Sequence, residues 1–146
     1  MQVPHGSCVV VADGAKMLFF RNEGDAEFLK LEVEQKREQE NLADRELMSD
    51  GHGAAPAGGG LGGSTYERAD HHQLEEDRFA AEAADMLKQR ALRGDFESLI
   101  IVAPPKTLGE MRKHYHKEVE KRLTGEIAKD LTGHTVEAIE KILQSQ

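Results

Sequence analysis

Short apolar runs alternate with turn signals over the first part of the chain, a pattern that predicts β-strands. Residues 7–12 read SCVVVA, which is typical of a buried strand, and residues 16–20 form a second β-prone run. Asp13 and Gly14 between these runs are a hairpin signal. Polar and apolar residues then alternate in a third predicted strand, whose apolar positions are Phe28, Leu29, Leu31 and Val33. We therefore expect an antiparallel meander of three strands.

Helical spacing replaces this alternation after residue 70. Apolar residues recur every three or four positions from Phe79 to Leu87, and Gly94 ends the run. Asp70 is expected to cap this helix, with Gln73 at the position that reaches back to the cap. The first helix is therefore predicted to begin near Asp70.

Two further strands and two further helices complete the predicted order. Residues 97–103, ESLIIVA, form the clearest buried strand, and residues 125–130 form a weaker one. Thr107 and Glu110 fit a capping box that opens a helix with an apolar stripe of Leu108, Met111, Tyr115 and Val119. A last helix is expected from about Thr135, burying Val136, Ile139 and Leu143. The order β-β-β-α-β-α-β-α predicts one α/β domain over residues 1–146, with a mixed five-stranded sheet and helices on its faces.

The segment at 35–68 lacks any apolar pattern. Seven of the 14 glycines lie between Gly51 and Gly63. Low-complexity sequence of this kind has high backbone entropy, so we expect a mobile glycine-rich loop between the third strand and the first helix. The glycines that mark the loop are Gly58, Gly59, Gly60, Gly62 and Gly63.

Composition narrows the function classes. The chain has 27 acidic and 19 basic residues, and its net charge of -8 argues against nucleic-acid binding by the whole surface. The longest apolar run, at 8–12, is too short to cross a bilayer, so no membrane insertion is expected. The N-terminal residues lack the pattern of a secretory signal, which predicts a cytoplasmic protein. Cys8, the single cysteine, is expected to be a small buried hydrophobe.

Five segments carry a resemblance to a known family. They read VVVADGAKMLFF (9–20), EQENLADRE (38–46), DRFAAEAADML (77–87), LIIVAPPKTLGEMRKH (99–114) and EIAKDLTGHTVEAIEKIL (126–143). Together they resemble the bacterial host-attachment protein family, whose members are described as required for attachment to host cells. The resemblance implies a phenotype rather than a reaction, so we expect a binding protein with an indirect effect on attachment.

The predicted strand order is also similar to the ribonuclease-H-like topology and to the middle domain of archaeal and eukaryotic peptide-chain release factors. In those factors a glycine-rich loop before a long helix carries a Gly-Gly-Gln tripeptide that acts at the ribosome. The corresponding residues 58–64 read GGGLGGS, and no glutamine follows either glycine pair. This resemblance therefore implies a fold and a loop rather than peptidyl-tRNA hydrolysis by the tripeptide.

The best candidate ligand site lies at the carboxyl ends of the predicted parallel strands. Open α/β sheets bind ligands at this edge, where we expect Asp13, Lys106 and Asp130 to project, with Lys129 beside them. Two carboxylates and a lysine can hold a divalent metal with a phosphate. The alternative is that Asp13 makes a turn and Asp130 caps a helix or pairs with Lys129.

A basic window spans residues 104–124, with six lysines and arginines against three glutamates. Its charges recur at helical spacing and are candidates for contact with RNA phosphates or an acidic protein. The alternative is a solvated helix face on which Glu118 pairs with Lys121 or Arg122. The candidate residues are Arg112, Lys113, Lys117, Lys121 and Arg122.

Other chemistry is incomplete in this sequence. His71 and His72 share helix faces with Glu75 and Glu76, but two ligands make a poor zinc site without a third. A nuclease could draw on Asp13 with Glu75 or Glu82, yet the fourth strand ends without a carboxylate.

We therefore expect a binding protein rather than an enzyme, with no cofactor and with an unidentified protein or RNA as its partner. The first alternative is an RNA- or ribosome-associated release-factor-like protein. The second is a metal-dependent phosphoesterase or nuclease.

Overall fold

The structure is a computed structural model that describes residues 1–38 and 61–146, with side chains described up to residue 38 and from residue 73. Its described strands form one five-stranded sheet in the order β3-β2-β1-β4-β5. They are β1 (Cys8–Ala12), β2 (Lys16–Asn22), β3 (Leu31–Glu38), β4 (Leu99–Ala103) and β5 (Leu123–Ala128). β2 is antiparallel to β1 and β3, whereas β4 is parallel to β1 and β5. The expected mixed α/β sheet is confirmed, and its order is consistent with a ribonuclease-H-like topology.

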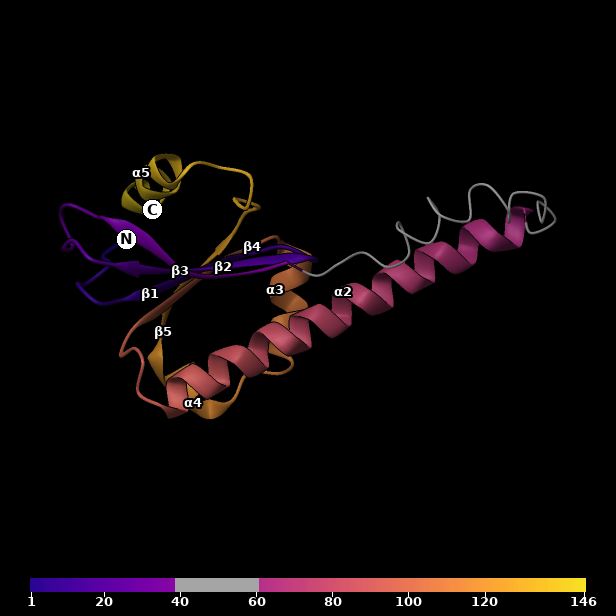
Figure 1. Ribbon diagram of the computed structural model, residues 1–146, viewed down its shortest axis with the longest axis horizontal. Helices are drawn as coiled ribbons and strands as arrows, with labels where there is room; N and C mark the ends of the chain where they lie inside the picture. The colour runs from indigo at the N-terminus through magenta and orange to yellow at the C-terminus, as the bar shows by residue number, and fades with distance from the viewer. Residues whose placement is uncertain (39–60) are drawn as a thin grey trace.

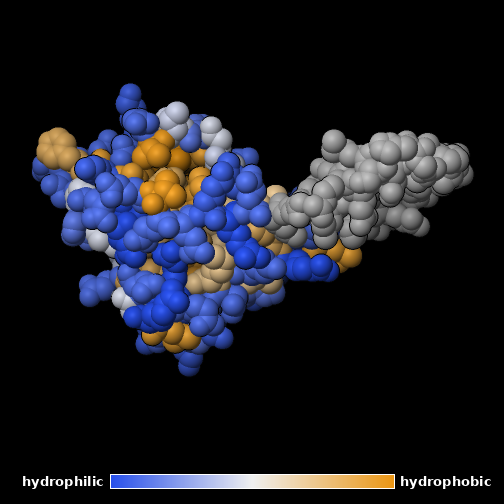
Figure 2. Space-filling view, viewed as in Figure 1, coloured by the Kyte–Doolittle hydropathy of each residue, from blue (hydrophilic) through white to orange (hydrophobic). Residues whose placement is uncertain are grey.

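Helices cover both faces of the sheet (Figure 1). On one face lie α2 (Leu61–Leu92), α3 (Pro105–Arg112) and α4 (Lys117–Arg122), and on the other lies the shorter α5 (Val136–Ser145). Among the described helices, we find none that combines the length and the apolar character needed to cross a membrane. Most of the surface in Figure 2 is hydrophilic, with a hydrophobic patch beside α5.

The central strand β1 supplies side chains to both layers of the core, which explains its unbroken apolar sequence. Cys8, Val10 and Ala12 join the cluster under α2, and Val9 and Val11 join the cluster under α5. All five residues are buried, because β1 has a strand on either side and a helix layer on either face.

The core residues that helix α2 contributes, among those with described side chains, lie in its C-terminal half. Phe79, Ala80, Ala83, Leu87 and Ala91 are buried at the spacing of one helix face. With 32 residues the helix is about 48 Å long. Figure 1 shows its N-terminal half extending well beyond the sheet. The molecule therefore has a compact body and a projecting helical arm.

The third strand differs from its predicted position. It begins at Leu31 and runs to Glu38, so Phe28 and Leu29 precede it. Asp25 Oδ1 accepts hydrogen bonds from the backbone N–H groups of Glu27 and Phe28, which folds this segment into a turn and leaves Phe28 74% exposed. Because β3 is an edge strand, its exposed positions can be charged, and the apolar pattern did not reveal its true extent.

The predicted loop at 35–68 was too long at both ends. Residues 35–38 belong to β3, and residues 61–68 belong to α2, including Gly62 and Gly63. Gly58, Gly59 and Gly60 lie outside the described residues. Asp70 lies within α2 and therefore does not cap it. Apolar periodicity missed the first turns because this half of α2 projects beyond the sheet.

The helix predicted from Thr107 is divided into two. α3 begins at Pro105 after Pro104, which makes no side-chain cap, so the proposed capping box is wrong. Proline at the first helical position starts the helix instead, because its φ angle is already helical. α4 starts after His116, whose ring accepts the backbone N–H of Glu118. Leu108, Met111 and Val119 are nevertheless all buried, as predicted.

The C-terminal predictions were more accurate. The fifth strand lies at Leu123–Ala128, two residues before its predicted position. Thr135 caps α5, and its hydroxyl accepts the backbone N–H of Ala138 at 3.2 Å. Ile139 and Leu143 are buried under this helix, as expected.

Candidate functional site

The carboxyl ends of β1 and β5 bring two aspartates together through a threonine. Asp13 directly follows β1, and Asp130 lies two residues after β5. Thr132 Oγ1 lies 2.8 Å from Asp13 Oδ2 and 2.9 Å from Asp130 Oδ1. The parallel arrangement of β1, β4 and β5 thus places Asp13 and Asp130 at the sheet edge that the sequence predicted.

Both aspartates also shape turns, which confirms the alternative expectation for Asp13, whereas the described contacts of Asp130 are with Thr132 rather than a helix cap or Lys129. Asp13 Oδ1 accepts the backbone N–H groups of Ala15 and Lys16, both at 2.7 Å, and closes the β1–β2 hairpin. Asp130 Oδ1 accepts the N–H of Thr132 at 3.3 Å. One oxygen of each carboxylate is therefore engaged in local backbone structure. Ligand binding by Asp13, Lys129 and Asp130 stays a prediction.

Lys106 makes its contact with α2. Its ammonium group donates to Gln73 Oε1, and Gln73 Nε2 donates to Asp77 Oδ1 at 2.8 Å. The cavity beside Lys106 is about 10 Å³, far below the size of a small-molecule site. Among the described contacts, none joins Lys106 to Asp13 or Asp130. Lys129 is exposed immediately after β5.

Glycine at position 14 permits the close approach of α2 to this edge. A Cβ atom at Gly14 would lie 2.9 Å from Cγ of Glu76 on α2. The helix therefore crosses directly over the β1–β2 turn. In the sequence, Gly14 is recognisable only as part of a hairpin signal.

Glutamates neutralise much of the predicted basic face. Arg112 pairs with Glu126 at 2.7 Å, and Lys113 pairs with Glu110 at 2.9 Å. Lys121 and Arg122 pair with Glu118, as the alternative for this segment predicted. The five basic candidates are divided between the end of α3, the residue after it and α4, so they do not share one helix face. Contact of these residues with RNA or a protein stays a prediction.

The nearby Tyr115 is also engaged within the protein. It is partly buried, and its hydroxyl donates to Glu126 Oε2 at 3.1 Å. Burial, together with the Glu126 carboxylate, raises the pKa of Tyr115 above its ordinary value. Tyr115 therefore supports the packing of α4 and β5, and its ring is not fully presented for stacking on a base.

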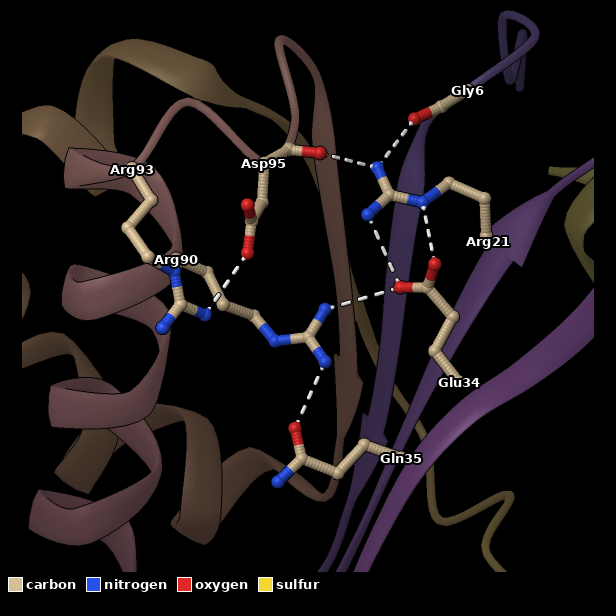
Figure 3. A network of polar contacts seen from close by, with 7 residues as sticks. All are labelled: Gly6, Arg21, Glu34, Gln35, Arg90, Arg93 and Asp95. Atoms are coloured by element: carbon tan, nitrogen blue, oxygen red, sulfur yellow. Dashed lines mark hydrogen bonds and ion pairs between the residues drawn. The ribbon is translucent and has the colours of Figure 1, made fainter.

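A polar network that the sequence analysis missed joins α2 to the β2–β3 edge (Figure 3). Glu34 Oε1 forms ion pairs with Arg21 and with Arg90, each at an N–O distance of 3.1 Å. Arg90 also donates a hydrogen bond to Gln35 Oε1 at 2.8 Å. Arg21 donates to the carbonyls of Gly6 and Asp95. The residues of this network are spread along the chain from Gly6 to Asp95, so their contact becomes visible only in the folded structure.

The electrostatics of this network favour an ionised glutamate. Burial raises the pKa of Glu34, but hydrogen bonds and charges from Arg21 and Arg90 outweigh it and lower the pKa below its ordinary value. The guanidinium carbon of Arg90 also lies 4.2 Å from the ring centroid of Phe19, a cation–π contact. These contacts fasten the C-terminal end of α2 to the sheet.

Comparison with known proteins places this fold in a family. The model of bacterial archaeo-eukaryotic release factor family 12 matches residues 7–143, nearly the whole chain. The chain belongs to that family. Relatives include "Uncharacterized protein RP470" of Rickettsia prowazekii (strain Madrid E), which is 34% identical over 84 residues. The match covers 54% of this chain and 55% of the relative, so the chain spans about half the length of that protein.

Metal binding was the other chemistry that the sequence of this release-factor-like chain left open. The residues described with side chains contain no group of three or more His, Cys, Asp or Glu positioned to hold a metal ion. The side chains of His71 and His72 lie outside the described residues. Cys8 is buried, and burial raises the pKa of its thiol to about 11, so it is a core residue as expected.

Proposed function

We propose that this protein is a release-factor-like protein that binds the ribosome through RNA contacts. The observation that carries the proposal is the family match over residues 7–143. It supports the release-factor-like alternative better than the expected role in host attachment, which the family description does not mention. An indirect effect on attachment stays a prediction from sequence resemblance.

The projecting arm supports the proposal because its shape suits a binding site that lies in a cleft. The N-terminal half of α2 extends beyond the sheet, and the C-terminal half is fixed by buried residues and by the Glu34 network (Figures 1 and 3). A helix held in this way can carry its N-terminal end into a cleft that the compact body cannot enter. Release factors place their glycine-rich loop before a long helix in the same order along the chain.

The proposed activity is binding without peptidyl-tRNA hydrolysis by a Gly-Gly-Gln tripeptide. Residues 58–64 read GGGLGGS and provide no glutamine after a glycine pair. The net charge of -8 further argues that RNA contact is local rather than spread over the surface. Because binding to RNA phosphates releases counterions, association should weaken as salt rises.

Co-sedimentation with purified ribosomes tests this proposal. We expect the wild-type protein to pellet with ribosomes at low salt and to dissociate as salt is raised. Deletion of residues 51–63 should reduce the pelleted fraction by at least about tenfold, because it removes the segment that precedes the arm and the first three residues of the arm itself. Absence of wild-type association at low salt would contradict the proposal.

A matched pair of charge variants shows which surface contributes. Lys117→Glu reverses an exposed charge on α4, and Lys141→Glu makes the same change on α5, on the opposite face of the sheet. We expect only the α4 variant to weaken ribosome binding. Equal effects of the two variants would indicate a general charge effect rather than a local interface.

A further inference from the structure

The outer edge of β3 is a second surface with the properties of an interface. β3 is last in the sheet order, and no strand among the described residues pairs with its outer side. Its seven residues after Leu31 are all exposed. The backbone N–H of Leu31 already donates to Glu140 Oε2 at 2.7 Å, so the edge after Leu31 is the part that offers backbone groups to another strand. We propose that two copies of this protein pair through antiparallel β3 strands to form a two-fold symmetric dimer.

A β-bulge determines which side chains of β3 share a face. Val33 is opposite Phe20 and Gln35 is opposite Phe19, so Glu34 is an extra residue in the strand. Phe19 belongs to the core under α2, whereas Phe20 belongs to the core under α5. Because side chains alternate along β2, each position of β3 takes the face of the residue it pairs with.

This assignment places two sets of residues on opposite faces. Glu32, Gln35 and Arg37 are opposite Arg21, Phe19 and Met17 and lie on the α2 face, and Glu34 points to Arg21 and Arg90 on that face (Figure 3). Leu31, Val33, Lys36 and Glu38 lie on the α5 face. The bulge thus puts Glu32 and Arg37 on one face although they are an odd number of positions apart.

One antiparallel register of two β3 strands keeps every cross-strand pair on a matching face. In this register Glu32 is opposite Arg37 of the second copy, and Arg37 is opposite its Glu32. Val33 likewise meets Lys36, whose aliphatic stem can pack on it. Opposite charges in directly opposed positions stabilise strand pairing. The acidic first half of β3 therefore complements its basic second half when the strand meets a copy of itself.

A groove lies beside Arg37, the residue that faces the partner's Glu32 in this register. It has a volume of about 430 Å³ and is lined by Arg37, Arg78, Ala81, Glu82, Asp85 and Met86. Arg37 already pairs with Glu82 at 2.6 Å and is 47% exposed on its side chain. Glu32 is 55% exposed, and its one ion pair among the described residues is a long one, at 3.8 Å, with Lys30. The partner's carboxylate would lie near both arginines of the groove, whose lining also includes the carboxylates of Glu82 and Asp85.

The proposed dimer does not depend on the proposed ribosome binding. Charge-reversal variants of Glu32 and Arg37 test the dimer. We expect the wild-type protein to sediment as a dimer, and Glu32→Lys and Arg37→Glu each to weaken association by about tenfold or more, because each opposes like charges twice in the symmetric interface. A mixture of the two variants should form a heterodimer, in which the introduced lysine of one chain faces the introduced glutamate of the other. Sedimentation velocity with one chain fluorescently labelled measures both results.

Controls separate a broken interface from a damaged fold. Lys141→Glu reverses an exposed charge on α5 and should leave the dimer intact. If Arg37→Glu disturbs its own fold through repulsion from Glu82, the double variant Arg37→Glu/Glu82→Gln removes that repulsion. The alternative role of the charges and the bulge of β3 is to keep the edge strand unpaired, and a monomeric protein is the result expected from that role. A monomeric wild-type protein, or variants that fail to associate when mixed, would overturn the proposal.

Discussion

Glu34 lies between two arginines that come from different parts of the chain. Arg21 belongs to β2 and Arg90 to the end of α2, with side chains 16% and 11% exposed. Each guanidinium has lost most of its contact with water, so it depends on the shared carboxylate for compensation. At the residue scale, this network determines how firmly the arm is attached to the sheet.

Glu34→Gln should destabilise the protein by about 1–2 kcal/mol at neutral pH, because two largely buried guanidinium groups lose their counter-charge. The carboxyl pKa is lowered in the folded protein, so its contribution is complete above the ordinary value of 4.5 and is lost as pH falls through the lowered value. The difference between wild type and variant should therefore shrink in acid. Urea unfolding at neutral and acidic pH measures it.

Glu38→Gln is the control for this prediction. Glu38 lies on the same strand but pairs with Lys36 at 3.9 Å, and both side chains are more than half exposed. Its replacement should change stability by less than about 0.5 kcal/mol. Equal effects at the two positions would contradict a special role for Glu34.

At the residue scale, sequence patterns predicted where the candidate site residues lie in the fold better than they predicted which side chains contact one another. The strand ends placed Asp13 and Asp130 at one edge, because parallel strands share their carboxyl ends. They did not show that Lys106 contacts Gln73 on α2, nor that Thr132 joins the aspartates. Those contacts depend on where α2 crosses the sheet and how the β5–α5 connection folds, neither of which is encoded in local spacing.

At the scale of elements, burial rather than propensity explains which boundaries were predictable. The α5 cap at Thr135 and the buried strand β4 have local signals, and both were found. β3 buries only Leu31 and was predicted displaced, and the first half of α2 projects beyond the sheet and was predicted too short. Hydrophobic periodicity reports contact with the core, so it is weak for an edge strand and for a projecting helix.

The two halves of α2 should respond differently to the same substitution. Leu87→Ala removes a fully buried side chain and should cost about 2–4 kcal/mol through lost packing and a cavity. Leu74 is 60% exposed on the same helix, so Leu74→Ala should change stability by less than about 0.5 kcal/mol. Chemical denaturation of both variants measures the difference. A large effect at Leu74 would contradict a helix docked only by its C-terminal half.

At the scale of the whole molecule, element order was sufficient to predict the sheet. A meander followed by alternating strands and helices requires parallel crossovers, and the observed order β3-β2-β1-β4-β5 satisfies this requirement. The same order suggested the comparison with release factors, and the family match over residues 7–143 agrees with it. The body and arm together are the basis of the proposed ribosome contact.

A binding titration on purified ribosomes tests this account most directly. Labelled wild-type protein is added at low salt, and the bound fraction is measured after sedimentation. We predict saturable binding that approaches one protein unit, a monomer or a dimer, per ribosome and that weakens steeply with added salt. Binding that never saturates, or no binding at low salt, would contradict the account.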